Sequence, residues 1–199
     1  MDKRFVIVSG HPGSGKTTLA RDLAPLLGLP LIDKDDILER LFEAKGVGDA
    51  EWRRRLSRES DALLQAEAGQ STGAVLTSFW RLPGLPPDSG TPTEWLFDLS
   101  EIIVTVRCVC PAEIAAERFT RRTRHPGHLD GLRTYAEVLS SILALPPITS
   151  LNLGEVVDVD TRGLGAPDAV AREIQHAFTR CLRSACSRRR PGEIMSRRG

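Results

Sequence analysis

The segment that most constrains this chain is Gly10-His11-Pro12-Gly13-Ser14-Gly15-Lys16-Thr17. It follows the apolar run from Phe5 to Val8 and precedes a stretch with helical periodicity. A strand, a glycine-rich loop and a helix in this order form a phosphate-binding P-loop. Glycines let consecutive backbone N–H groups approach phosphate oxygens, and the helix points the positive end of its dipole at the same anion.

This loop predicts ATP and Mg²⁺ as cofactors. We expect Lys16 to reach the β- and γ-phosphates and the Thr17 hydroxyl to bind Mg²⁺. The residues of this segment that we predict to bind the nucleotide are Gly10, His11, Pro12, Gly13, Ser14, Gly15, Lys16, Thr17 and Thr18.

The composition of the 199 residues is typical of a globular protein, with 41% hydrophobic and 27% charged residues. No run approaches the roughly 18 apolar residues that span a membrane, so we predict no membrane partner. The chain enters its first predicted strand soon after Met1, which predicts no signal peptide and a cytoplasmic protein. We expect one kinase-sized domain over residues 1–179.

Residues 180–199 form a basic end, with seven arginines and one acid, whereas the rest of the chain has 20 basic and 25 acidic residues. Such a segment could contact nucleic acid or another anionic partner. We favour a solvated, disordered tail without a partner.

Hydrophobic periodicity predicts strands over residues 4–9, 29–33, 74–80, 102–109 and 155–160. Helices are predicted over 15–27, from 35 to about 46, over 49–68, 112–122 and 130–144, and from 167 onward, with a short amphipathic segment at 92–99. The alternation indicates a parallel α/β sheet covered by helices on both faces. Ligands of such sheets bind at the carboxyl ends of the strands, where the glycine loop and Asp35 should meet.

Two sequence motifs that mark other P-loop proteins, the nucleotide-driven motors and the GTPases, are absent from this chain. A nucleotide-driven motor usually carries a second apolar strand that ends in an acid holding Mg²⁺, and neither 74–80 nor 102–109 does. The guanine-reading motif Asn-Lys-x-Asp is also missing. Small P-loop kinases can function without both features.

Three stretches make the chain resemble the P-loop kinase family that includes the kinase domain of polynucleotide kinases, zeta-toxin-like kinases and chloramphenicol phosphotransferase. They are the glycine loop through Ala20, the acid-containing segment 32–37, and Cys110-Pro111-Ala112-Glu113 with the basic segment 117–122. The resemblance implies a nucleoside-monophosphate-kinase-like fold. It has a five-stranded parallel sheet of order 2-3-1-4-5 and a small arginine-bearing lid over about 118–131.

The resemblance also implies roles for individual residues. Lid arginines Arg118 and Arg122, four apart and so on one helical face, should neutralise charge on the β/γ oxygens together with Lys16. Arg121 and Arg124 remain open. Asp35 is expected to orient the acceptor hydroxyl and take its proton, with helix capping as the alternative.

Several other residues carry weaker expectations. Asp33 could hold Mg²⁺ through water, and Asp36 should be exposed in the first helical turn. Trp80 and Arg81 should face the cleft and contact the acceptor, although packing would also explain Trp80. The resemblance places Thr161 beside adenine, and a hinge explains His125 and His128 as well as a catalytic role does.

We therefore expect an enzyme that moves the γ-phosphoryl group of ATP to a hydroxyl of a small molecule such as a nucleoside, sugar or antibiotic. A polynucleotide 5′-hydroxyl kinase is the first alternative, and the acidic balance before residue 180 argues against it. The second alternative is an ATP-binding switch or partner-binding module without kinase activity.

Overall fold

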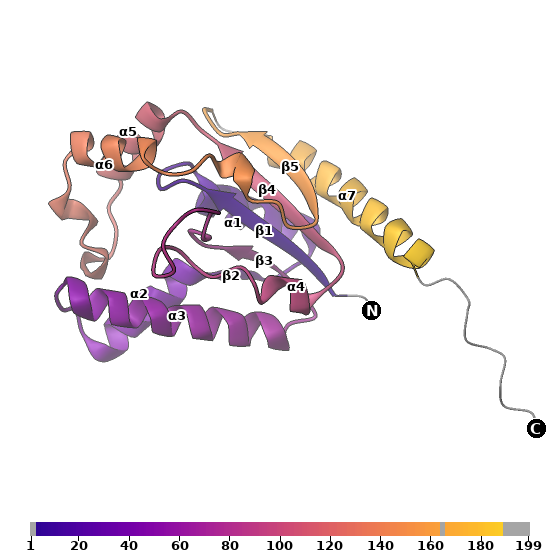
Figure 1. Ribbon diagram of the computed structural model, residues 1–199, viewed down its shortest axis with the longest axis horizontal. Helices are drawn as coiled ribbons and strands as arrows, with labels where there is room; N and C mark the ends of the chain where they lie inside the picture. Colours follow the sequence, from indigo (N-terminus) through magenta and orange to yellow (C-terminus); the bar gives the residue numbers. More distant parts are fainter. Residues whose placement is uncertain (1–2, 164–165, 189–199) are drawn as a thin grey trace, which may run out of the picture.

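The central strand of the sheet is β1 (Arg4–Gly10), and the glycine loop follows it directly. The computed structural model describes residues 3–163 and 166–188. Five parallel strands lie in the order β2-β3-β1-β4-β5, with helices on both faces (Figure 1). The other strands are β2 (Leu31–Asp33), β3 (Gly73–Thr77), β4 (Ile103–Val109) and β5 (Glu155–Asp160).

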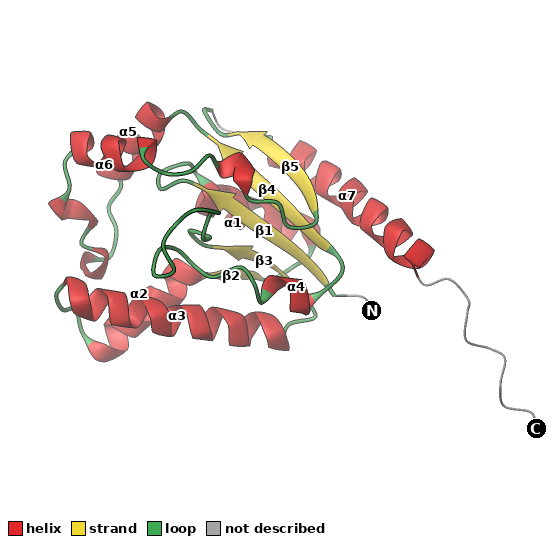
Figure 2. Cartoon of the chain, viewed as in Figure 1, coloured by secondary structure: helices red, strands yellow, loops and turns green. Residues whose placement is uncertain are grey.

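The helices form the outer layers around the sheet (Figure 2). They are α1 (Lys16–Leu27), α2 (Lys34–Lys45), α3 (Ala50–Gln70), α4 (Leu96–Leu99), α5 (Ala112–Arg121), α6 (Tyr135–Leu143) and α7 (Pro167–Arg188). Short 3₁₀ turns are η1 (Pro126–His128), η2 (Asp130–Leu132) and η3 (Ile148–Ser150).

Side chains alternate across the sheet, so β1 contributes to two separate cores. Val6 and Val8 pack with side chains of α1 and α7, whereas Phe5 and Ile7 pack with side chains of α3 and α4 on the opposite face. All four are fully buried. Burial on both faces explains why the strand is a continuous apolar run in the sequence, and it fixes the strand end from which the glycine loop begins.

Helices α5 and α6 pack on each other through a small core of their own, which includes Phe119 and Val138. The chain between them, residues 122–134, is named the lid segment below. It carries η1 and η2 and extends from α5 to α2, the helix that begins directly after β2 (Figure 1).

The predicted α/β sheet and its strand order are confirmed. The predicted strand 74–80 is too long, because β3 ends at Thr77 and the chain turns into a loop. The predicted helix 130–144 is divided: η2 comes first, and α6 begins after a capping box in which Thr134 and Glu137 bond each other's backbone N–H. In the segment 92–99 only α4 is helical.

Helix α7 also corrects the predicted start of the tail. It continues through Arg188, so residues 180–188 belong to the helix. Arg180 itself pairs with Glu155 of β5 at 2.7 Å. The remainder of the predicted tail, 189–199, lies outside the described residues. Within the described ranges, no helix has the length and apolar character needed to cross a bilayer.

Candidate active site

The glycine loop folds into a tight turn between β1 and α1 that only glycine permits at two positions. Gly13 and Gly15 have φ values of 78° and 89°, in the left-handed region. A Cβ on Gly13 would lie 2.0 Å from the carbonyl oxygen of Ala115 in α5. The loop is therefore held against α5 by direct backbone contact.

The first turn of α1 is open for an anion. Its N-cap is Gly15, which has no side chain to bond the free N–H groups. Lys16 is 8% exposed, and burial lowers the pKa of its ammonium group while the charge of Asp35 opposes that shift. The buried hydroxyl of Ser14 has no hydrogen-bond partner among the described residues. Free N–H groups, a buried cation and an unpaired hydroxyl together fit a bound polyphosphate.

Two carboxylates, Asp33 and Asp35, lie where β2 ends and α2 begins, and they have different roles. Asp33 is the N-cap of α2, because its Oδ1 accepts from the backbone N–H of Asp35 at 2.9 Å. The alternative that Asp35 caps this helix is therefore wrong. Asp35 lies in the first turn, half-buried, with its Oδ2 2.5 Å from Nη2 of Arg124. Asp36 is exposed as predicted and pairs with Arg21 at 3.0 Å.

The charges around these carboxylates move their pKa values in opposite directions. Burial, followed by the charge of Asp35, raises the pKa of Asp33 to about 6. Burial would also raise the pKa of Asp35, but the positive charges of Arg124 and then Lys16 outweigh it and lower that pKa. Asp35 is thus an ionised carboxylate at neutral pH, suited to accept a proton once a hydroxyl is held against it.

We expect Asp33→Asn to stabilise the protein at pH 8 by about 3 kcal/mol, since the rise in the pKa of Asp33 makes its ionised form costly in the folded state. Asparagine still caps a helix. The folded pKa lies above the unfolded one, so the cost is complete above pH 6 and disappears towards pH 4. Urea unfolding of both proteins at pH 8 and pH 4 measures the difference. An equal effect at both pH values would contradict a charge origin.

The lid arginines Arg118 and Arg122 do not share a helical face, because α5 ends at Arg121 and Arg122 has an extended backbone. Arg118 donates to the carbonyl oxygens of Thr161 and Arg162 at 2.7 and 2.8 Å. Arg122 lies over the ring of Phe119 and donates to Asp130 at 3.1 Å. The Nε of Arg122 is buried without a partner in the described part of the chain.

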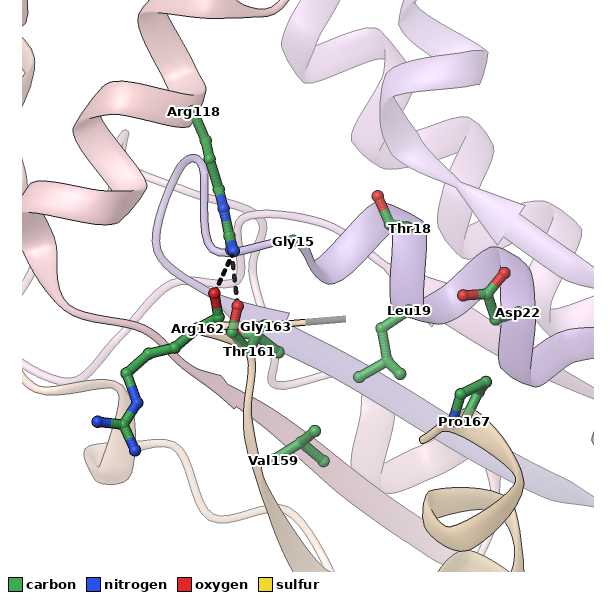
Figure 3. Close-up of a pocket in the computed structure, with 10 residues that line it drawn as sticks. All are labelled: Gly15, Thr18, Leu19, Asp22, Arg118, Val159, Thr161, Arg162, Gly163 and Pro167. Carbon is green, nitrogen blue, oxygen red and sulfur yellow. Dashed lines mark hydrogen bonds between the residues drawn. The ribbon is translucent and has the colours of Figure 1, made fainter. Parts of the chain in front are cut away.

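A pocket of about 470 Å³ opens beside the glycine loop, where Arg118 descends from α5 to the end of β5 (Figure 3). Its lining residues are Gly15, Thr18, Leu19, Asp22, Arg118, Val159, Thr161, Arg162, Gly163 and Pro167. The size is typical of a small-ligand site. The predicted positions Thr18, Arg118 and Thr161 meet here, whereas Lys16 and Asp35 are not part of its lining.

The expectation that Trp80 and Arg81 face the acceptor is wrong. Trp80 is 1% exposed and donates its indole N–H to the carbonyl of Val8 at 3.0 Å. The guanidinium of Arg81 bonds the carbonyls of Pro87 and Ser89 and so braces the following loop. Both residues come after the end of β3, where the chain turns, so strand alternation no longer sets their direction.

A buried polar network beside the carboxylates escaped the sequence reasoning. Lys34, between Asp33 and Asp35, pairs with Asp61 of α3 at 2.6 Å. Asp61 also accepts from the Thr91 hydroxyl at 2.7 Å, and Thr91 bonds Ser78 at 2.5 Å. The network ties the start of α2 to α3 and to the loop after β3. Its members are far apart in sequence, and the one sequence signal is a lysine between two acids.

The lid histidines dock the lid segment on α2. His125 stacks on Phe42 with 5.3 Å between ring centroids, and His128 meets the same ring edge-on. His128 Nε2 lies 2.8 Å from Oε1 of Glu39. A Cβ on Gly127 would lie 2.5 Å from the Phe42 ring. In this structure the segment predicted as a hinge is therefore packed closely on the helix that carries Asp35.

The sheet order and the glycine loop define a P-loop protein with a kinase-like fold. The family model described as "AAA domain" matches residues 5–139, and the chain belongs to this family. An uncharacterised protein of Mycobacterium tuberculosis is 29% identical over 149 residues, 69% of this chain and 29% of that protein. The shikimate kinase of Corynebacterium glutamicum is 39% identical over 72 residues, 36% of this chain and 43% of that enzyme. The match thus spans less than half the length of these relatives.

Solved structures support the same fold. A "putative kinase" from Chloroflexus aurantiacus superposes with a TM-score of 0.71 and 28% identity, covering 89% of this chain and 99% of that one. The shikimate kinase of Bacteroides thetaiotaomicron has a TM-score of 0.53 at 19% identity, covering 92% of this chain and 98% of that one. The gluconokinase of Sinorhizobium meliloti has a TM-score of 0.51 at 17% identity, covering 94% and 98%. The last two share the fold and no more.

Proposed function

We propose that this protein is an ATP-dependent phosphotransferase that moves the γ-phosphoryl group of ATP to a hydroxyl of a small molecule, such as a nucleoside, sugar or antibiotic. One observation carries the proposal: the ionised carboxylate of Asp35 lies close enough to Lys16 of the glycine loop for each to shift the pKa of the other. A phosphate-binding cation and a proton acceptor thus share one site. The kinases among the relatives support the same class of reaction.

In this proposal the chain holds ATP through the glycine loop and the pocket of Figure 3. The open N–H groups of the loop and Lys16 bind the phosphates. Thr161 and Arg118, which hydrogen-bond each other, take the adenosine end. Lys16 and Asp35 do not line this pocket, so we propose that the adenosine end occupies it and that the γ-phosphate lies near Lys16 and Asp35.

The residues present also fit Mg²⁺. The Thr17 hydroxyl, in the first turn of α1, and Asp33, whose Oδ2 is buried without a partner among the described residues, would hold the ion directly and through water. When bound, the ion neutralises charge on the phosphate oxygens. In the proposed reaction Asp35 receives the proton of the acceptor hydroxyl. Arg122, whose buried Nε has no partner in the described part of the chain, approaches the transferring group.

The narrower resemblance to polynucleotide kinases, zeta-toxin-like kinases and chloramphenicol phosphotransferase remains part of the proposal. It agrees with an acid pair after β2, but the contacts expected from Trp80 and Arg81 do not support it. The acceptor therefore has to be found by experiment.

The test is a panel of hydroxyl-bearing acceptors incubated with γ-labelled ATP and Mg²⁺ and read by mass spectrometry. We expect one chemical class to gain a phosphoryl group, with Lys16→Met as the inactive control. Labelled 5′ ends of oligonucleotides would instead support the polynucleotide alternative. Tight ATP binding with every acceptor unmodified would contradict the proposal and favour a nucleotide-dependent switch.

A further inference from the structure

The side chain of the proposed base Asp35 is 39% exposed, and an arginine of the lid segment pairs with one of its two carboxylate oxygens. Nη2 of Arg124 lies 2.5 Å from Oδ2 of Asp35, and Nη1 of the same side chain lies 3.0 Å from Oδ2 of Asp130. The Arg124 and Asp130 side chains are only 15% and 17% exposed. Arg124 is therefore clamped between two carboxylates, one from α2 and one from its own segment.

The position of Arg124 is fixed by the docking of the lid segment on α2. Gly127, three residues after Arg124, lies so close to the Phe42 ring that a side chain would not fit there. His128, which is buried and bonded to Glu39, meets the same ring edge-on. Both contacts are with the helix that carries Asp35, so Arg124 and Asp35 stay together as long as the segment stays docked.

Arg124 differs from the other lid arginines in what it bonds. Arg118 bonds carbonyl oxygens beside the pocket, and Arg121 pairs with Glu117 on the surface. Arg122 donates one Nη to Asp130, and its buried Nε has no partner among the residues that the structure describes. Both Nη atoms of Arg124 lie against carboxylates: Nη1 donates to Asp130, and Nη2 is ion-paired with Asp35. One of these carboxylates, Asp35, is the group proposed to meet the acceptor, and the other, Asp130, is shared with Arg122.

We propose that Arg124 is a positioning residue that keeps Asp35 occupied until an acceptor displaces it, and so makes the site prefer an acceptor hydroxyl over water. The proposal rests on the proposed function. In hydrolysis, a water oxygen would bond to the γ-phosphorus while the bond to the β–γ bridging oxygen breaks. ADP would leave with that electron pair, and the water proton would pass to Asp35. An acceptor that contacts the lid segment can separate Arg124 from Asp35, whereas a water molecule cannot.

The first test measures the ion pair without any reaction. The charged and titratable groups near Asp35 in the described part of the chain include Arg124, Lys16, His128, Arg122, Asp33 and Lys34. Carbon-13 NMR of carboxyl-labelled aspartate, assigned with Asp35→Asn, follows the pKa of Asp35 in the ligand-free protein. We expect Arg124→Gln to raise that pKa by about one or more, within the range that removal of an adjacent charge produces. Arg121→Gln, the matched control, should leave it unchanged.

The second test measures phosphate release from ATP with no acceptor present. General-base assistance contributes about 10²–10⁴-fold, so Arg124→Gln should raise release at least tenfold with nucleotide affinity unchanged. Arg124→Lys, which keeps the charge, should return release toward the wild-type value. Adding Asp35→Asn to Arg124→Gln should abolish the gain.

The outcomes of these tests distinguish a failure of the proposed role of Arg124 from a failure of the transferase proposal. Unchanged or slower phosphate release by Arg124→Gln would overturn the role of Arg124, and slower release with weaker ATP binding would make it a phosphate ligand. An unchanged pKa of Asp35 would also overturn it. If Arg124→Gln releases phosphate faster but the wild-type protein modifies no acceptor, the transferase proposal fails while the shielding of Asp35 stands.

Discussion

Asp35→Asn is expected to lower the kcat of phosphoryl transfer by about 10³-fold, the middle of the range for loss of a general base. Asparagine has nearly the same shape and leaves the cap of α2 in place, because Asp33 supplies that cap. It cannot take the proton of the acceptor. ATP affinity should change little, since the glycine loop and the pocket of Figure 3 do not include this residue. Steady-state transfer assays and ATP titration measure the two effects separately.

Asp36→Asn is the matched control for this prediction. It removes a carboxylate from the same turn, but Asp36 is exposed and pairs with Arg21 of α1. We expect its kcat to equal that of the wild-type protein. Full transferase activity in Asp35→Asn would show that Asp35 is not the base, and Asp33 would then be the next carboxylate to test.

Gly13→Ala is expected to lower the free energy of unfolding by about 3 kcal/mol, the sum of a left-handed backbone cost and a steric overlap. The new Cβ would lie 2.0 Å from the Ala115 carbonyl, a backbone atom that cannot rotate away. The loop and α5 would have to separate. Urea unfolding without nucleotide measures the effect directly.

Gly15→Ala separates the two parts of that cost. Gly15 also has positive φ, but the nearest atoms to its Cβ position are 3.8 Å away. Gly15→Ala should therefore lower the free energy of unfolding by the backbone cost alone, about 1 kcal/mol. If the two variants were equally destabilised, the contact between the loop and α5 would not be the tight one that the structure shows.

The lid shows most clearly where sequence reasoning stopped. The spacing of Arg118 and Arg122 predicted that they share one helical face. That prediction requires the helix to include Arg122. The helix ends one residue earlier, so Arg118 lies beside the pocket and Arg122 near Lys16 and Asp35. Where a helix ends depends on what its last turn packs against, and local periodicity does not contain that information.

Trp80 gives a second example. Its place after a predicted strand suggested a direction toward the cleft, but the strand had already ended at Thr77. The indole N–H instead donates to the backbone carbonyl of Val8 in β1. A large aromatic side chain gains more from burial than from a contact in water, and only the surrounding core shows that space was available for it.

The sequence by itself determined the parallel sheet, the phosphate-binding loop and the acid pair near the end of β2, because each depends on a local pattern of apolar, glycine or acidic residues. The strand order was implied by the resemblance to a P-loop kinase family. Only the tertiary structure decided that Asp33 caps α2, that Arg124 pairs with Asp35 and that Lys34 pairs with Asp61. The two ion pairs join residues from distant parts of the chain. Their partners are chosen by how helices and loops pack, and packing is a property of the whole fold.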